Sequence, residues 1–242
     1  MLLLSLGSLA EASPLRERYQ QAEQALKKNE VSRYQQLRQG LDAYPLTINL
    51  DYQYLADRIT QLSTAQIRDF MARYPDSQQA DRLERQYLFR LAREQRWQEF
   101  LAFYPQLPNS VELQCAHYQA KWATGDRATA LAGAERLWLH GQSRPGICDP
   151  LFETWYRAGG RNDEHIWQRM LLAYESGQEG LIAFLSRLLS PSVRPAGELL
   201  QALYKDPRQL NRPERVQAPS ARHKAAVAMA LARLADSDPE LV

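Results

Sequence analysis

Residues 118–125 read Tyr118-Gln119-Ala120-Lys121-Trp122-Ala123-Thr124-Gly125, and a second helix-forming run follows at 128–139. In and before the first run, Cys115, Tyr118 and Trp122 recur at helical spacing. Gly125 can adopt the left-handed backbone conformation that commonly ends a helix. The stretch therefore predicts two short helices joined by a tight turn.

The same arrangement repeats along the chain. Turn-forming residues separate the periodic runs at intervals of 34, 32, 30 and 35 residues: Asn29, Ser63, Gln95, Gly125 and Gly160. Each interval holds two helical runs, and a hairpin of this kind cannot bury its apolar stripe alone, so neighbouring hairpins must stack. The spacing is too irregular for a strict tetratricopeptide array. We therefore predict an all-α fold, a right-handed α-superhelix or solenoid of irregular stacked helical hairpins, over residues 13–242.

The composition is that of an ordinary folded protein. The 242 residues are 45% hydrophobic and 24% charged, and this length is sufficient to bury a sizeable core. Thirty basic and 28 acidic residues leave a formal net charge of +2. We therefore expect neither nucleic acid nor an anionic membrane surface as a partner.

The first residues resemble the end of an export signal. Residues 1–9 are apolar or small, and Ala10-Glu11-Ala12 matches the A-x-A cleavage pattern, so we expect residues 1–12 to be a signal-peptide remnant. No Lys or Arg precedes the apolar run, which leaves a chance hydrophobic end as the alternative. Beyond it, no apolar run approaches the roughly 18 to 20 residues that cross a bilayer. We expect a soluble mature chain without a membrane span.

The last residues contain a second start signal. Residues 221–234 form an Ala- and Leu-rich helical pattern, and Asp238-Pro239-Glu240 then supplies a cap, a proline suited to the first helical position and an acidic residue. We expect this start to belong to a helix beyond Val242, so that the chain is truncated before further helical repeats. The apolar side of residues 225–234 would then be partly uncovered.

Motifs for enzyme chemistry are absent from the sequence. It contains no G-x-S-x-G, no G-x-x-x-x-G-K-[ST] and no G-x-G-x-x-G. The four histidines are spaced too widely for a metal-ligand pair such as H-E-x-x-H: His117, His140, His165 and His223. His165 follows Asn162-Asp163-Glu164, which we interpret as a helix start. We therefore assign no catalytic, cofactor-binding or metal-binding residue and expect no cofactor.

Carboxylates and aromatic rings are better explained by structure than by a site. Asp81 and Glu84 lie beside Arg82 and Arg85, which predicts a solvated ion-pairing face, and the Arg- and Gln-rich run at 82–96 is interpreted in the same way. Three tryptophans fall on apolar helical stripes near the two cysteines and are expected to pack in the core rather than to stack on sugar rings: Trp122, Trp138 and Trp155. Cys115 and Cys148, 33 residues apart, could form a disulfide or remain buried thiols.

Several blocks of the sequence are similar to one family, the soluble lytic transglycosylases of bacterial cell walls. Tyr44-Pro45-Leu46, Leu50 and Tyr52 resemble its early helices. The middle of the chain resembles its central block in residue type, order and spacing: Gln114-Cys115, Tyr118, Ala120-Lys121-Trp122, Thr124-Gly125, Glu135, Leu137-Trp138-Leu139, Cys148-Asp149, Leu151-Phe152 and Trp155. A weaker likeness continues through Asp206-Pro207 and 225–234.

This resemblance implies the N-terminal superhelical, ring-forming domain of the family, a periplasmic location and a disulfide between Cys115 and Cys148. In the family, a C-terminal lysozyme-like domain cleaves peptidoglycan between N-acetylmuramic acid and N-acetylglucosamine and leaves a 1,6-anhydro end. Its catalytic Glu lies in an E-S-x-x-N-P motif, with G-L-M-Q following, and neither motif occurs here. Glu175-Ser176 is followed by Gly177-Gln178-Glu179, so no catalytic role is transferred to Glu175.

The resemblance therefore implies a scaffold that binds or orients peptidoglycan glycan strands for a catalytic domain elsewhere in its parent. Other cell-wall enzymes are further expected partners. On this interpretation the chain alone is inactive. The alternative is a self-contained periplasmic helical-repeat adaptor that binds protein partners in a concave groove.

Overall fold

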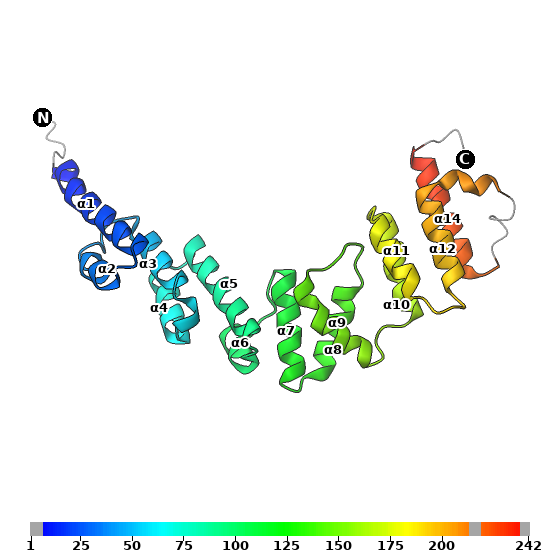
Figure 1. The fold of residues 1–242 in the computed structure, drawn as a ribbon, viewed down its shortest axis with the longest axis horizontal. Coiled ribbons are helices and arrows are strands. Elements are labelled where there is room, and N and C mark those ends of the chain that lie inside the picture. The colour runs from blue at the N-terminus through cyan, green and yellow to red at the C-terminus, as the bar shows by residue number, and fades with distance from the viewer. Residues whose placement is uncertain (1–6, 213–218, 238–242) are drawn as a thin grey trace, which may run out of the picture. The chain divides into compact units, whose positions relative to one another are not determined.

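The computed structural model describes residues 7–212 and 219–237, and its regular structure within them is entirely helical (Figure 1). The proposed helix start at Asp238-Pro239-Glu240 and the first six residues of the expected signal lie outside these ranges. Residues 7–12 lie in the first turns of a helix that continues to Lys27. Whether residues 1–12 are a signal remnant stays a prediction.

The chain divides into two compact units, Met1–Phe103 and Tyr104–Val242. The described part of unit 1 contains α1 (Gly7–Lys27), α2 (Val31–Arg38), α3 (Thr47–Ala56), the 3-10 turn η1 (Ile59–Gln61), α4 (Thr64–Arg73), α5 (Gln78–Arg93) and α6 (Trp97–Phe103). The described part of unit 2 contains α7 (Val111–Ala123), α8 (Arg127–Trp138), η2 (Gly146–Cys148), α9 (Asp149–Arg157), α10 (Asp163–Glu175), α11 (Glu179–Leu188), α12 (Arg194–Lys205), η3 (Pro207–Asn211) and α14 (Ala221–Ser237).

The predicted helix boundaries are confirmed where the sequence marked them. The quoted stretch ends α7, and α8 begins two residues after Gly125. Each interval between the five turn-forming residues holds two α-helices, as expected. Ser63 has a different role from the others, because its side chain caps the start of α4 through the backbone N–H of Gln66.

Among the described residues, five helix ends share one backbone geometry. The second residue after the helix has a positive φ, and the N–H of the residue that follows it donates to a carbonyl five residues earlier, as in a Schellman motif. At the end of α7, Gly125 has φ 99°, its N–H donates to the Trp122 carbonyl and that of Asp126 donates to the Lys121 carbonyl. The left-handed residues are Asn29, Gln95, Gly125, Gly159 and Gly177. This motif satisfies carbonyls at the helix end and turns the chain into the following helix.

Each unit has a core built from neighbouring helices. In unit 1, Ala22, Leu26, Tyr34, Leu41 and Leu50 join α1, α2 and α3. A larger cluster in unit 2 runs from Cys115 on α7 to Ala230 on α14. Stacking of adjacent hairpins therefore buries the apolar stripes, as the sequence pattern predicted.

The disulfide lies inside the core of unit 2. Cys115 on α7 and Cys148 at the end of η2 are bonded, and both are fully buried. Trp138 and Trp155 pack nearby with their rings 5.8 Å apart, which confirms their predicted core position. Trp122 was wrongly placed in the core: it is half-buried, with the Arg127 guanidinium over its ring. It lines a pocket with Thr154, Arg157 and Ala158, which are half-buried or exposed residues at the end of α9.

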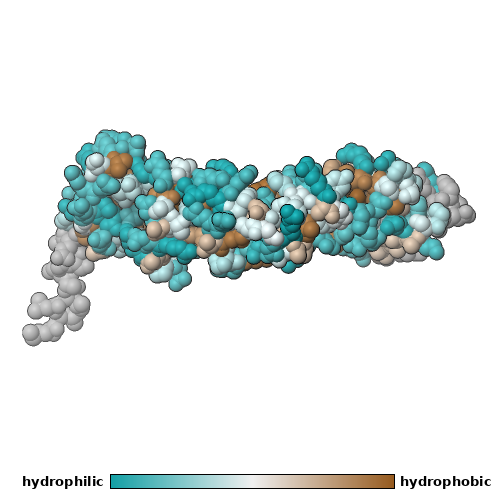
Figure 2. Space-filling model, turned by 90° about the horizontal axis from the view of Figure 1, so that it is seen from below, coloured by the Kyte–Doolittle hydropathy of each residue, from teal (hydrophilic) through white to brown (hydrophobic). Residues whose placement is uncertain are grey.

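The surface carries few large apolar side chains. Figure 2 shows a mostly hydrophilic face on which hydrophobic residues form small, separate spots. On α14, Ala226 and Ala230 are buried against the rest of unit 2, whereas Leu231 is 41% exposed. In the part of the chain that the structure describes, no helix has both the length and the apolar character required to cross a bilayer.

We predict that reducing the Cys115–Cys148 disulfide lowers the free energy of unfolding of unit 2 by about 3 to 4 kcal/mol, because the bond closes a loop of 33 residues in the unfolded chain. Urea denaturation of the oxidised protein, with and without dithiothreitol, measures the difference. The Cys115→Ala/Cys148→Ala variant serves as the control, since its stability must not respond to reductant. Two free thiols in the oxidised, denatured protein would contradict the assignment.

Candidate functional site

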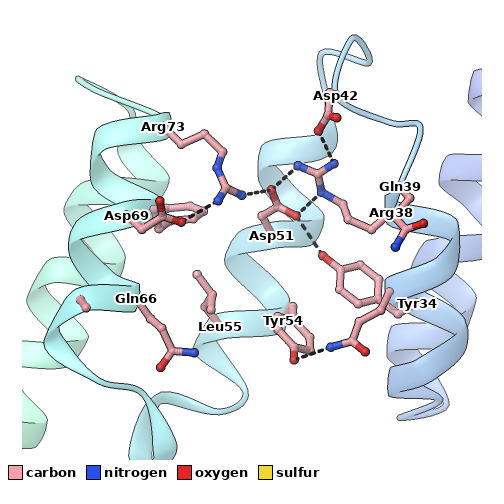
Figure 3. Close-up of a pocket in the computed structure, with 13 residues that line it drawn as sticks. Tyr34, Arg38, Gln39, Asp42, Asp51, Tyr54, Leu55, Gln66, Asp69 and Arg73 are labelled. Atoms are coloured by element: carbon pink, nitrogen blue, oxygen red, sulfur yellow. Dashed lines mark hydrogen bonds and ion pairs between the residues drawn. The ribbon is translucent and has the colours of Figure 1, made fainter.

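A pocket within unit 1 lies among α2, α3 and α4 and has a volume of about 720 Å³. Tyr34 and Arg38 face it from α2, Asp51 and Tyr54 from α3, and Arg73 from α4 (Figure 3). Apolar surface from Leu55 and Phe70 and amides from Gln35, Gln39 and Gln66 complete much of the lining. The pocket thus combines aromatic and amide groups around a buried charge.

Asp51 is the centre of this pocket, with only 6% of its surface exposed. Arg38 binds it with two hydrogen bonds, from Nε to Oδ1 at 2.5 Å and from Nη2 to Oδ2 at 2.8 Å. The Tyr34 hydroxyl donates to Oδ1 at 2.9 Å, and the Tyr74 hydroxyl donates to Oδ2 at 2.7 Å. Arg73 lies 3.5 Å from Oδ2, on the opposite side from Arg38 (Figure 3). Five contacts therefore compensate the buried carboxylate.

These contacts decide the ionisation of Asp51. Burial by itself raises the pKa of the carboxyl, but the hydrogen bonds from Arg38 and Tyr74 outweigh burial, and the pKa lies below its ordinary value. The same burial raises the pKa of Tyr34, with the negative charge of Asp51 adding to the effect. Asp51 is therefore an ionised anchor that joins three helices, and it cannot retain the proton that a general acid must donate.

The rim of the pocket offers weaker and more accessible polar groups. Gln35 donates to the Tyr54 hydroxyl over 3.4 Å, and the Tyr54 ring stacks on Tyr34 with centroids 5.0 Å apart. Asp69 and Arg73 form an ion pair that is largely exposed. Hydroxyl and amide groups beside an aromatic ring suit a polar, uncharged ligand such as a sugar.

Sequence reasoning did not identify Asp51. It named the neighbours Leu50 and Tyr52 for their resemblance but not the residue between them. A signal was nevertheless present, because Thr47, Leu50, Asp51 and Tyr54 recur at the spacing of one helix face. An Asp within a buried stripe requires compensating donors. The donors come from α2, α4 and Tyr74, which only the tertiary structure brings together.

The carboxylates and the basic run on α5 differ from the prediction. Among the described residues, Asp81 and Glu84 form no ion pair with Arg82 or Arg85. Glu84 is half-buried; burial, followed by the charge of Asp81, raises the pKa of its carboxyl. This face of α5 is therefore not the fully solvated ion-pairing surface that we expected.

Arg90 is a second correction on α5. Instead of lying on a solvated face, it is buried and donates to the carbonyls of Ile59 and Leu62 as well as to Glu94. Arg90 lies three residues after Tyr87 and seven after Leu83, which places its side chain on the buried face of the helix. There its long stem and fork of donors satisfy carbonyls at the η1 turn.

The histidines occupy separate surroundings. His165 lies at the start of α10, as predicted, and contacts Asn162 and Glu135. His117 is buried, and burial lowers its pKa. Within the described ranges, no three His, Cys, Asp or Glu side chains are grouped so that they could hold a metal ion. Glu175 ends α10 next to the turn at Gly177.

We predict that Asp51→Asn lowers the free energy of unfolding by about 3 to 5 kcal/mol at neutral pH, because it removes the buried charge partner of Arg38 and leaves that guanidinium paired only with the exposed Asp42. Since the folded-state pKa of Asp51 is depressed, its contribution is present above the unfolded pKa of about 3.9 and is lost as the pH falls through the folded value. The difference between wild type and variant should shrink accordingly in acid.

Urea denaturation at a series of pH values measures this difference, and hydrogen exchange of α2 and α3 locates it. Asp42→Asn is the matched control, because Asp42 also pairs with Arg38 but its side chain is 85% exposed. That change should alter stability by no more than about 1 kcal/mol. Equal effects of the two substitutions would contradict the central role of Asp51.

The sequence of this chain is similar to those of known proteins. No protein-family model matches it. The soluble lytic murein transglycosylases of Escherichia coli and Salmonella typhimurium are each 34% identical to it over 209 residues, which cover 85% of this chain and 32% of theirs.

The fold is also similar to solved structures of lytic transglycosylases. The 70 kDa soluble lytic transglycosylase of Escherichia coli is 30% identical, with a TM-score of 0.79 over 94% of this chain and 37% of its own. An inactive mutant of the lytic transglycosylase Slt of Pseudomonas aeruginosa is 33% identical, with a TM-score of 0.84 over 92% of this chain and 36% of its own.

The chain thus spans about a third of the length of these relatives. The agreement extends over nearly all of its own length and confirms the all-α fold of stacked hairpins. Sequence and fold together identify the chain as a homologue of the soluble lytic murein transglycosylases.

Proposed function

We propose that this chain is the helical scaffold of a periplasmic lytic transglycosylase and that it holds peptidoglycan glycan strands for a catalytic domain elsewhere in the parent protein. The parent cleaves the bond between N-acetylmuramic acid and N-acetylglucosamine and leaves a 1,6-anhydro end. The similarity in sequence and fold to enzymes of that name, over nearly the whole chain, carries the proposal.

The chemistry of the described carboxylates supports a non-catalytic role. Cleavage of a glycosidic bond requires a carboxylic acid that keeps its proton until it reaches the bridging oxygen. Asp51 is ionised within its ring of donors, and the pKa of Glu99 is lowered by hydrogen bonds from Thr64 and Tyr87. Glu84 is the described carboxyl best suited to retain a proton, because burial raises its pKa. It is therefore the residue on which a test for activity should concentrate.

The pocket in unit 1 supports a role in holding glycan. Its rim presents the Gln35 amide and the Tyr54 hydroxyl, which bond to each other only over 3.4 Å and can exchange that contact for sugar hydroxyls. The Asp51 network fixes the helices that carry them, so that these groups are held in place before a ligand arrives. The hydroxyl groups of a glycan strand are neutral hydrogen-bonding groups, and they can pair with the amide and the hydroxyl at this rim.

We predict that this chain releases no anhydro-muropeptides from purified peptidoglycan sacculi, because the buried carboxyl in the described pocket of unit 1, Asp51, is held ionised and cannot act as a general acid. Digestion followed by mass spectrometry measures the products. The soluble lytic murein transglycosylase of Escherichia coli serves as the positive control. Anhydro products that disappear in the Glu84→Gln variant would overturn the scaffold assignment.

We also predict that the chain sediments with sacculi and that the double variant Gln35→Ala/Tyr54→Phe binds them severalfold less well. The matched control is Gln86→Ala/Tyr52→Phe, which removes a similar exposed Gln–Tyr hydrogen bond, 3.0 Å long, that lies outside the pocket. Co-sedimentation at a series of sacculus concentrations measures both. Equal losses in the two double variants would exclude this pocket as the glycan site.

A further inference from the structure

A second pocket, in unit 2, contains an unusual excess of buried positive charge. It has a volume of about 340 Å³ and lies between the end of α8, the loop that follows it, and α9, α10 and α11. Three arginines from different parts of the sequence line it: Arg144, Arg161 and Arg169. No motif had drawn attention to them, since they are separated by 17 and 8 residues in the chain.

Arg169 is the most deeply placed of the three, with 4% of its surface exposed. Its guanidinium carbon lies 4.0 Å from the centre of the Trp138 ring. Its Nε and Nη2 groups donate over long distances, 3.3 and 3.4 Å, to the backbone carbonyls of His140 and Gln142. These contacts are neutral, and no carboxylate in the described part of the chain pairs with the guanidinium.

The other two arginines add positive charge to the pocket and bring no negative group to compensate it. Arg144 donates through Nε to the Leu137 carbonyl, and Arg161 lies over the Tyr156 ring at 3.9 Å. Within the described residues, none of the three has a carboxylate oxygen within 4.0 Å. Burial, followed by the charge of Arg144, lowers the pKa of Arg169 to about 10, and burial lowers that of Arg144. Both directions are those of cations that lack an anionic partner.

The acidic residues of the pocket do not supply that partner. Glu153 forms its ion pair with Arg157, at 3.0 Å, and Asp149 forms none with the three arginines. Trp138 contributes one more donor, because its buried indole N–H has no acceptor among the residues that the structure describes. The polar groups of the pocket that lack a full partner are therefore mainly hydrogen-bond donors, and an anion could accept hydrogen bonds from them.

The remaining walls of the pocket are apolar. Phe152, Leu181 and Phe184 line it beside Trp138, and Phe184 is 45% exposed although it is a large hydrophobic residue. An inorganic anion would satisfy the arginines but would leave these side chains uncovered. A ligand with both a carboxylate and a small hydrocarbon part would satisfy both halves of the pocket.

We propose that this pocket binds an organic carboxylate, such as the free carboxyl terminus of a short peptide with small aliphatic side chains. The carboxylate would accept hydrogen bonds from the guanidinium groups of Arg169 and Arg144, and the half-exposed Arg161 would contact it at the entrance of the pocket. Pairing turns an uncompensated buried cation into a charge-assisted, hydrogen-bonded pair. The site is separate from the pocket of unit 1 and does not depend on the glycan-holding role.

Titration of the whole chain with acetyl-Ala-Ala, by isothermal calorimetry and by the shift in thermal midpoint, tests the proposal. We expect saturable binding and a raised midpoint. The amide, acetyl-Ala-Ala-NH2, should bind at least about tenfold more weakly, because it carries no charge. Inorganic phosphate should likewise bind at least about tenfold more weakly, because it does not cover the apolar walls. Equal binding of the amide or of phosphate would overturn the assignment to an organic carboxylate, as would no binding of the peptide.

Substitutions separate a binding role from a structural one. Arg169→Met should abolish binding while leaving the unliganded protein as stable as wild type or more stable, since it removes a buried charge that has no partner. Arg161→Gln, at a half-exposed position, should weaken binding severalfold without affecting the fold. Arg187→Gln, an exposed change on α11, is the matched control and should bind as wild type does. Unchanged binding in Arg161→Gln and Arg169→Met, or an equal loss in Arg187→Gln, would overturn the proposal.

Discussion

The fold depends on the fact that a two-helix hairpin exposes an apolar stripe that only another hairpin can cover. In this chain the Schellman turns at Asn29, Gln95 and Gly125 reverse the backbone within a few residues and satisfy helix-end carbonyls at the same time. The following helix is thereby brought against the preceding one, and burial spreads from neighbour to neighbour. The cores of the two units and the covered disulfide in unit 2 follow from this constraint.

Buried charge is treated in opposite ways in the two units. In unit 1, Asp51 receives donors from two arginines and two tyrosines, so that its burial joins helices α2, α3 and α4. In unit 2, Arg169 has a similar degree of burial, but its partners among the described residues are neutral carbonyls and an aromatic ring. Because an uncompensated buried charge is costly, the first arrangement is a structural anchor, whereas the second resembles a site that a ligand completes.

This difference also bears on the proposed role of the chain. A scaffold needs fixed surfaces that present hydrogen-bonding groups, and the Asp51 network fixes the helices around the Gln35 and Tyr54 rim. An enzyme needs a carboxyl that keeps its proton in a cleft, and the described carboxylates in well-formed networks are held in the ionised form. The proposed division of labour within the parent protein is therefore consistent with the physical chemistry of this segment.

The sequence alone determined the class of fold, the helix ends and most of the core. Helical spacing and turn residues are local signals, so α7, Gly125 and α8 could be read directly, as could the burial of Trp138 and Trp155. The sequence did not determine which charged side chains face inward. Asp51, Arg90 and Arg169 look like ordinary polar positions until helices distant in the sequence supply, or fail to supply, their partners. Compensation of a buried charge is a property of tertiary contacts, and for that reason both pockets emerged only from the folded structure.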